Sequence, residues 1–97
     1  MSPDDRWRVS HMIDAAEQAL TFVRGRDRSD LDGDAMLLFA LTRAVEVVGE
    51  AATKVSEGGR SELPAVPWLQ IAGMRNRLVH AYFSINNDVL WDTVHLA

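Results

Sequence analysis

The stretch from Asp34 to Ser56, DAMLLFALTRAVEVVGEAATKVS, decides the fold. Its apolar residues recur at alternating steps of four and three, which is the spacing of one face of an α-helix. This first stripe consists of Leu37, Leu41, Ala44, Val48, Ala51 and Val55. A second stripe, at steps of seven, consists of Leu38, Val45 and Ala52. Because two apolar stripes indicate burial on two sides, we expect one side of this helix to face the core and the other to face a partner subunit.

The polar residues of the same helix share a third face. They are Arg43, Glu46, Glu50, Thr53, Lys54 and Glu57. We interpret this face as solvated, in preference to a role for Glu46 and Glu50 as active-site acids. Gly49 in the middle of the helix costs about 1 kcal/mol relative to Ala. It therefore indicates a close helix approach, for which a dimer partner is one candidate.

A helix is also predicted before this stretch. Ser2 can cap it, Pro3 suits its first position, and Asp5 adds an acid to its first turn. Gly25 is a plausible stop, and residues 26–33 are charged and rich in Asp, as in a loop. The predicted core stripe of this helix is Val9, Ile13, Ala16, Leu20 and Val23.

After the long helix, Gly58 and Gly59 predict its end. A third helix is expected to open at Pro67 and to run to Tyr82, and a fourth from Asp88 to Ala97. No segment shows strand alternation bounded by hairpin turns. The predicted class is all-α, a bundle of about four helices in one domain spanning residues 1–97.

Length and composition restrict the size of the core, the kinds of site and the cellular location that are expected. With 97 residues there is room for one small core, so oligomerisation is a fair expectation. The chain has no cysteine, which excludes disulfides and thiolate metal sites and fits a reducing cytoplasm. No apolar run approaches the roughly 18 residues that span a bilayer, and the acidic N-terminus does not resemble a signal peptide. We therefore expect a soluble cytoplasmic protein without membrane contact.

The charge is unevenly distributed. The net charge of −4 argues mildly against nucleic-acid binding. From Leu63 to Asn87, however, the only charged residues are Arg75 and Arg77, and His80 lies close by. A local positive site on an acidic body therefore remains possible.

The residues of this positive segment suit metal-free RNA cleavage. On a regular helix Asn76, Arg77 and His80 share one side, and Arg75 and Tyr82 share another. The length of the Arg75 side chain, or unwinding near His80, allows the groups to converge on one anion. His80 can take a proton from a ribose 2′-OH at neutral pH. Arg75 would neutralise charge on the phosphate.

Asn76 would orient His80 or donate to the phosphate. One histidine cannot easily serve as both base and acid, and a two-fold dimer would supply a second Arg–His set. Taken alone, these residues are better explained by a surface helix with a hydrogen-bonded histidine. Tyr82 is then better explained as a core aromatic, and Arg77 as either solvated or in contact with phosphate.

Two other site types are weighed and set aside. His11 and His95 are far apart, and Asp92 with His95 makes only a pair, whereas a metal site needs three or four converging ligands. No metal or cofactor is therefore expected. The three tryptophans could stack bases, but Trp68 and Trp91 lie in apolar patterns that are typical of a core.

The run from Arg75 to Tyr82, RNRLVHAY, resembles the Arg-x4-His-x-Tyr motif of HepT-type toxins in the HEPN superfamily of helical ribonucleases. The resemblance extends to AVEVVGEAA at 44–52, VPWLQIAGM at 66–74 and DVLWDTV at 88–94. It covers nearly the whole chain, and the motif with its flanks is specific. HepT-like proteins usually continue the last helix further, so this chain is expected to carry a shortened one, whether natural or truncated.

The resemblance implies metal-independent RNA cleavage at a cleft between two protomers, with Arg75 and His80 catalytic. It also implies an MntA-like nucleotidyltransferase antitoxin that transfers AMP to Tyr82. An adduct beside Arg75 would occupy the position of the substrate phosphate. The main alternative is a non-catalytic HEPN module that serves as binding or scaffold partner of a minimal nucleotidyltransferase. A purely structural helical dimerisation domain is the third interpretation.

Overall fold

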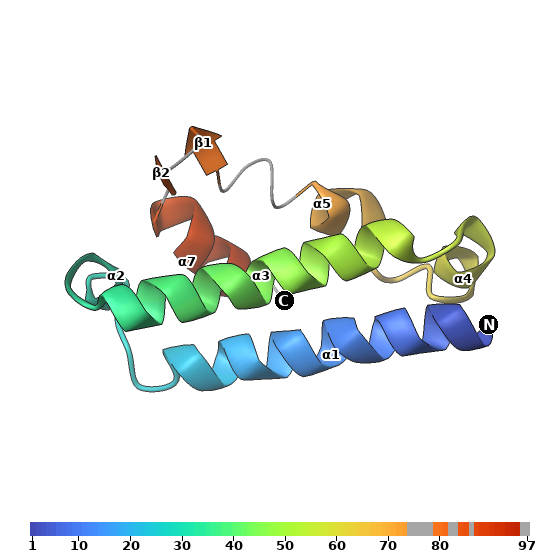
Figure 1. Ribbon diagram of the computed structural model, residues 1–97, viewed down its shortest axis with the longest axis horizontal. Coiled ribbons are helices and arrows are strands. Elements are labelled where there is room, and N and C mark those ends of the chain that lie inside the picture. The colour runs from blue at the N-terminus through green and yellow to red at the C-terminus, as the bar shows by residue number, and fades with distance from the viewer. Residues whose placement is uncertain (74–78, 82–83, 86, 96–97) are drawn as a thin grey trace.

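The computed structural model describes residues 1–73, 79–81, 84–85 and 87–95, with side chains for 1–73 and 88–95. Two long helices, α1 and α3, lie side by side along the longest dimension of the molecule (Figure 1). α5 and α7 pack against α3, and α7 also reaches α1. The helices are α1 (Pro3–Val23), α2 (Asp30–Gly33), α3 (Ala35–Lys54), α4 (Glu57–Glu62), α5 (Trp68–Ala72) and α7 (Asn87–His95). The all-α class is confirmed, and α1, α3, α5 and α7 correspond to the four expected helices.

The predicted ends of α1 are confirmed. The Ser2 hydroxyl accepts a hydrogen bond from the Asp5 N–H at 3.1 Å, and Pro3 is the first helical residue. At the other end the helix stops at Val23, and Gly25 adopts a φ of +72°. That conformation is open to glycine at no steric cost, which explains why the chain turns here.

The predicted core stripe of α1 is largely wrong. Ile13 and Leu20 are 52% and 46% exposed, and only Val23 of the stripe is buried. The face that α3 covers instead is displaced around the helix from the predicted stripe and shares Val23 with it. Small side chains on this face let two long helices approach closely. The buried residues of α1 are Asp5, Met12, Ala15, Ala19 and Val23.

The start of α3 follows the sequence prediction. Asp34 is its N-cap, and its carboxylate accepts from the Leu37 N–H at 3.0 Å. In the second stripe, however, Val45 and Ala52 are 4% and 0% exposed within the single chain. The expectation that this stripe faces a partner subunit is therefore wrong, because α5 and α7 of the same chain cover it.

The buried residues form two clusters, and α3 contributes to both. The first cluster joins α1, α2, α3 and α7, and the second joins α1, α3 and α5. Members of the first are Ala19, Val23, Leu31, Leu37, Leu41, Ala44, Val45, Leu90 and Val94. Members of the second are Met12, Ala52, Val55 and Trp68. α5 and α7 are thus anchored on α3 by separate apolar contacts.

Gly49 explains how closely α5 approaches. It is buried, and a Cβ at this position would lie 3.4 Å from the Ile71 carbonyl oxygen. The close helix approach inferred from the sequence is therefore real. The approaching helix is α5 of the same chain.

Two local predictions between the helices are corrected. Gly58 and Gly59 do not terminate α3 but lie inside α4. The reason is Ser56, whose hydroxyl accepts from the Gly59 N–H at 3.1 Å and starts a new helix. The predicted loop 26–33 likewise contains the single-turn helix α2.

The third predicted helix is shorter than expected. α5 ends at Ala72, where the Gly73 N–H bonds to the Leu69 carbonyl at 3.1 Å. Residues 79–81 form strand β1 (Val79–Ala81), which pairs antiparallel with β2 (Ser84–Ile85). The continuous helix to Tyr82 is therefore wrong at 79–81. The β-branched residues Val79 and Ile85 are partners in this pair, which suits their preference for extended backbone.

Within the described ranges, no helix is long and apolar enough to cross a membrane.

Candidate functional site

The two helices on either side of the sequence motif are anchored in the core. On the N-terminal side of the motif Trp68 of α5 is buried, and its indole N–H donates to the Leu63 carbonyl at 3.0 Å. On the C-terminal side of the motif Leu90 of α7 is fully buried in the first cluster. Figure 1 shows α5, β1, β2 and α7 on the side of α3 away from α1. The core thus fixes the two helices that flank the motif in the sequence.

Most of the predicted site residues lie outside the described residues. This holds for Arg75, Asn76, Arg77 and Tyr82, whose convergence stays a prediction. His80 is the middle residue of β1, and its side chain is likewise outside the described part. Its backbone is extended, so the helical-face argument that joined it to Asn76 and Arg77 does not apply. The alternative of an unwound chain near His80 agrees with β1.

A pair missed by the sequence analysis lies at the start of α7. The Arg28 Nε is 2.6 Å from Asp88 Oδ1, and its Nη1 is 2.9 Å from Asp32 Oδ2. The hydrogen bond with Asp88, followed by that with Asp32, raises the pKa of Arg28 above its ordinary value. Arg28 therefore ties the first turn of α7 to α2, and its guanidinium is already occupied by two carboxylates. No local spacing signals this pair, because its members are 60 residues apart.

An apolar groove lies beside the two helices that bracket the motif. It has a volume of about 230 Å³ and draws on α1, α3, α5 and α7. Its described lining residues are Met12, Ile13, Ala16, Ala19, Leu20, Val45, Val48, Ile71, Thr93 and Val94, of which Thr93 alone is polar. This part of the lining suits apolar side chains.

The polar face of α3 is solvated, as the sequence analysis preferred. Glu50 is exposed, and Glu46 pairs with Arg43 of the same helix at 3.6 Å. Neither carboxylate lines one of the described hollows.

Trp68 and Trp91 pack in the core, as predicted, whereas Trp7 is exposed. Trp68 is buried, with the Arg60 guanidinium 5.7 Å from its ring centre, and Trp91 is half-buried against the first cluster. Trp7 is 60% exposed and contacts the His11 ring, with ring centres 4.1 Å apart and the planes tilted by 49°. In the part of the chain that the structure describes, no three His, Asp or Glu side chains come together as they would around a metal ion.

Comparison with known proteins gives consistent matches. Residues 12–96 match the profile of a family described as "Ribonuclease HepT-like". The matched range contains the whole motif segment, including Arg75, His80 and Tyr82.

Individual relatives carry ribonuclease names. A protein of Caldanaerobacter subterraneus subsp. tengcongensis named "Putative RNase" is 34% identical over 86 residues, which cover 89% of this chain and 77% of that protein. A "Probable ribonuclease HepT" of Thermococcus cleftensis is 37% identical over 86 residues, covering 89% of this chain and 78% of that protein. A "Putative RNase" of Methanocaldococcus jannaschii is 32% identical over 83 residues, covering 86% and 76% respectively. No solved structure matches the chain.

Proposed function

Because the chain belongs to the Ribonuclease HepT-like family, we propose that it is a metal-independent endoribonuclease, the toxin of a cytoplasmic toxin–antitoxin pair. The observation that carries the proposal is the family match over residues 12–96, which includes the intact run from Arg75 to Tyr82. The ribonuclease names of the relatives support RNA as the substrate.

The proposed reaction is an internal attack within the RNA. The His80 imidazole removes the proton from a ribose 2′-OH, and the resulting oxygen attacks the adjacent phosphorus. The bond from phosphorus to the 5′-oxygen of the next nucleotide breaks, and that oxygen leaves with a proton. The products are a 2′,3′-cyclic phosphate and a 5′-hydroxyl. No water or metal is consumed in this step.

The other motif residues support the same step. Arg75 neutralises the charge that develops on the phosphoryl oxygens, an effect that is usually the largest electrostatic contribution. Asn76 and Arg77 contact the phosphate or orient the imidazole. A second copy of the chain supplies the His80 that returns a proton to the leaving oxygen, because one imidazole starts the step as the base.

The proposed control acts on Tyr82. An MntA-like nucleotidyltransferase, the antitoxin, transfers AMP from ATP to the phenolic oxygen and releases pyrophosphate. The adduct places a negative phosphate two residues from His80 along the chain. It competes with the RNA phosphate for the same cations and repels the substrate.

The proposal is tested with purified, unmodified protein and labelled RNA in EDTA. Intact mass is measured first, because an adduct on Tyr82 would mask cleavage. We expect cleavage that is lost in Arg75→Ala and in His80→Ala and kept in Arg24→Ala, an exposed arginine at the end of α1. Unmodified, folded protein that leaves diverse RNAs intact would exclude the enzyme and favour the binding module.

A further inference from the structure

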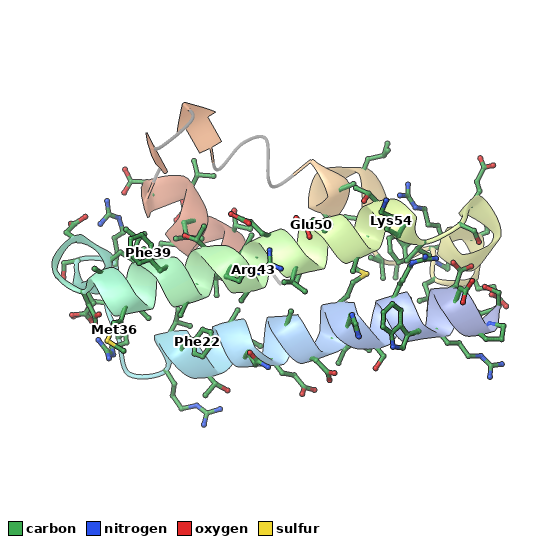
Figure 2. The ribbon with its side chains drawn as sticks, viewed as in Figure 1. Phe22, Met36, Phe39, Arg43, Glu50 and Lys54 are labelled. Atoms are coloured by element: carbon green, nitrogen blue, oxygen red, sulfur yellow. The ribbon has the colours of Figure 1, made fainter. Side chains whose placement is uncertain are left out.

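The start of α7 is held by two different kinds of contact. Below the surface, Leu31 of α2 and Leu90 of α7 are 1% and 0% exposed and belong to the same apolar cluster. At the surface, Arg28, just before α2, reaches Asp88 in the first turn of α7. In Figure 2, α2 and the start of α7 lie at the same end of α3, the end where Met36 is labelled.

The Arg28 guanidinium bonds in two directions. Its Nη1 donates to both carboxylate oxygens of Asp32, at 3.0 and 2.9 Å, and its Nε donates to Asp88 Oδ1 at 2.6 Å. Asp32 belongs to α2, so it holds the guanidinium against α2 while Nε points to α7. Hydrogen bonds are directional, whereas apolar burial is not. The Arg28–Asp88 contact therefore fixes the orientation of the first turn of α7, which burial of Leu90 alone does not set.

The first turn of α7 follows directly on the strand pair that contains His80. β2 ends at Ile85, and α7 begins at Asn87. Ile85 pairs with Val79, the residue before His80 in β1. A displacement of the first turn of α7 therefore shifts β2, and through the strand pair it shifts the backbone of His80.

We propose that Arg28 is a positioning residue for the proposed ribonuclease, because through Asp88 it sets where β1 presents His80. Arg28 acts through the backbone and not on the RNA, since its guanidinium is already paired with two carboxylates. The proposal deepens the proposed function, on which it rests for the role of His80. The side chains of Arg28 and Asp88 are 35% and 76% exposed, and exposed ion pairs add little to overall stability. Loss of the pair should therefore be felt locally.

The first test is amide hydrogen exchange of the full chain at low salt, without RNA. Exchange in β1 and β2 should accelerate about threefold in Arg28→Gln and in Asp88→Asn. The double variant should exchange no faster than either single variant, because each substitution breaks the same contact. Circular dichroism should show melting temperatures close to that of the wild type.

Arg26→Gln is the matched control. It also removes one positive charge and breaks a partly exposed pair, between Arg26 Nη1 and Asp34 Oδ2 at 3.1 Å. Asp34 is the N-cap of α3 and does not belong to α7. Exchange in β1 and β2 should therefore stay as in the wild type.

The second test is the kinetics of RNA cleavage. Arg28→Gln and Asp88→Asn should each lower kcat about tenfold, because a small displacement of a catalytic group is costly. KM should stay unchanged in both. The two substitutions alter the net charge in opposite directions, so a direct effect of charge on RNA binding would move KM in opposite directions. A fall in kcat alone in both variants is the signature of a displaced catalytic group.

Three outcomes would overturn the proposal: unchanged exchange in β1 and β2, additive effects in the double variant, or opposite shifts of KM at constant kcat. Its failure is separable from that of the proposed function, because amide exchange needs no RNA. Wild type that cleaves no RNA, but whose β1 exchange depends on Arg28, keeps the coupling of Arg28 to His80 and removes the enzyme. Cleavage that neither substitution alters does the reverse.

Discussion

The carboxylate of Asp5, in the first turn of α1, is hydrogen-bonded to Ser56, 51 residues later in the chain. It accepts from the Ser56 backbone N–H at 2.9 Å and also from the Ser56 hydroxyl. Asp5 is only 3% exposed, and its partner is the N-cap of α4. One buried carboxylate therefore joins the start of α1 to the turn that follows α3.

Asp5→Asn is expected to make stability less dependent on acid pH. The Ser56 hydroxyl, and after it the Ser56 N–H, lower the pKa of Asp5 below its ordinary value of 3.8. Because the folded-state pKa is lowered, the stabilisation is fully present above pH 3.8 and is lost as the pH falls through the lower folded-state value. At neutral pH the variant should have a lower melting temperature than the wild type. This difference in melting temperature should disappear in acid.

Melting followed by circular dichroism between neutral pH and about pH 2.5 checks this expectation. Asp4→Asn is the control, because Asp4 is exposed in the same helical turn and has the same relation to the helix dipole. A difference in melting temperature that stays constant with pH would contradict the role given to the Asp5–Ser56 hydrogen bonds.

Gly59→Ala and Gly58→Ala should act in opposite directions. A Cβ at Gly59 would lie 2.5 Å from Asp5 Oδ2 and 3.1 Å from Val55 Cγ1, so Asp5 would have to leave Ser56. We expect a loss of about 1–3 kcal/mol in the free energy of unfolding. At Gly58 the nearest such atom, the Ser56 hydroxyl oxygen, is 3.9 Å away. Alanine there should stabilise the protein by about 0.4–1 kcal/mol, and urea titration of the two variants measures both changes.

Leu90→Ala should cost about 2–5 kcal/mol of unfolding free energy. Leu90 is fully buried and connects α7 to the first cluster, so its loss loosens the helix that follows the motif. Leu69→Ala removes the same atoms from a residue that is 84% exposed and should stay within about 0.5 kcal/mol of the wild type. Chemical denaturation gives the free energies, and amide exchange in α7 shows whether that helix opens first. Equal costs for the two leucines would contradict the observed packing.

Tyr82→Phe should keep RNA cleavage but escape silencing. The phenyl ring retains the apolar part of tyrosine and lacks the oxygen that accepts AMP. The measurement incubates each protein with the nucleotidyltransferase and ATP, then records intact mass and RNA cleavage. Wild type should gain the adduct and lose activity, whereas the variant should do neither. Equal silencing of both proteins would exclude Tyr82 as the control point.

Sequence reasoning located the long helices well because their ends have local causes. Ser2, which the sequence predicts as a cap, and Asp34 hold the starts of α1 and α3 through contacts three residues away. Which face of α1 is buried was not predictable in the same way. The periodicity of Ile13 and Leu20 marks a helix, but the choice between neighbouring faces depends on how closely α3 can approach Ala15 and Ala19.

The candidate site was predictable in its residue types and not in its geometry. Arg75, His80 and Tyr82 stand out through the resemblance, whereas the helix expected to carry them gives way to a strand at Val79–Ala81. Contacts between distant residues leave no periodic signal. The Arg28–Asp88 and Asp5–Ser56 pairs are contacts between distant residues, so they are seen only in the folded structure.

Because α3 contributes residues to both apolar clusters, it affects how the protein unfolds. Two cores in one small chain suggest two independently melting halves, but a single unbroken helix contributes Leu41 to one cluster and Ala52 to the other. Fraying at one end must therefore propagate along the helix from one cluster to the other. A single sharp transition with one heat-absorption peak is the calorimetric signature of such a shared backbone.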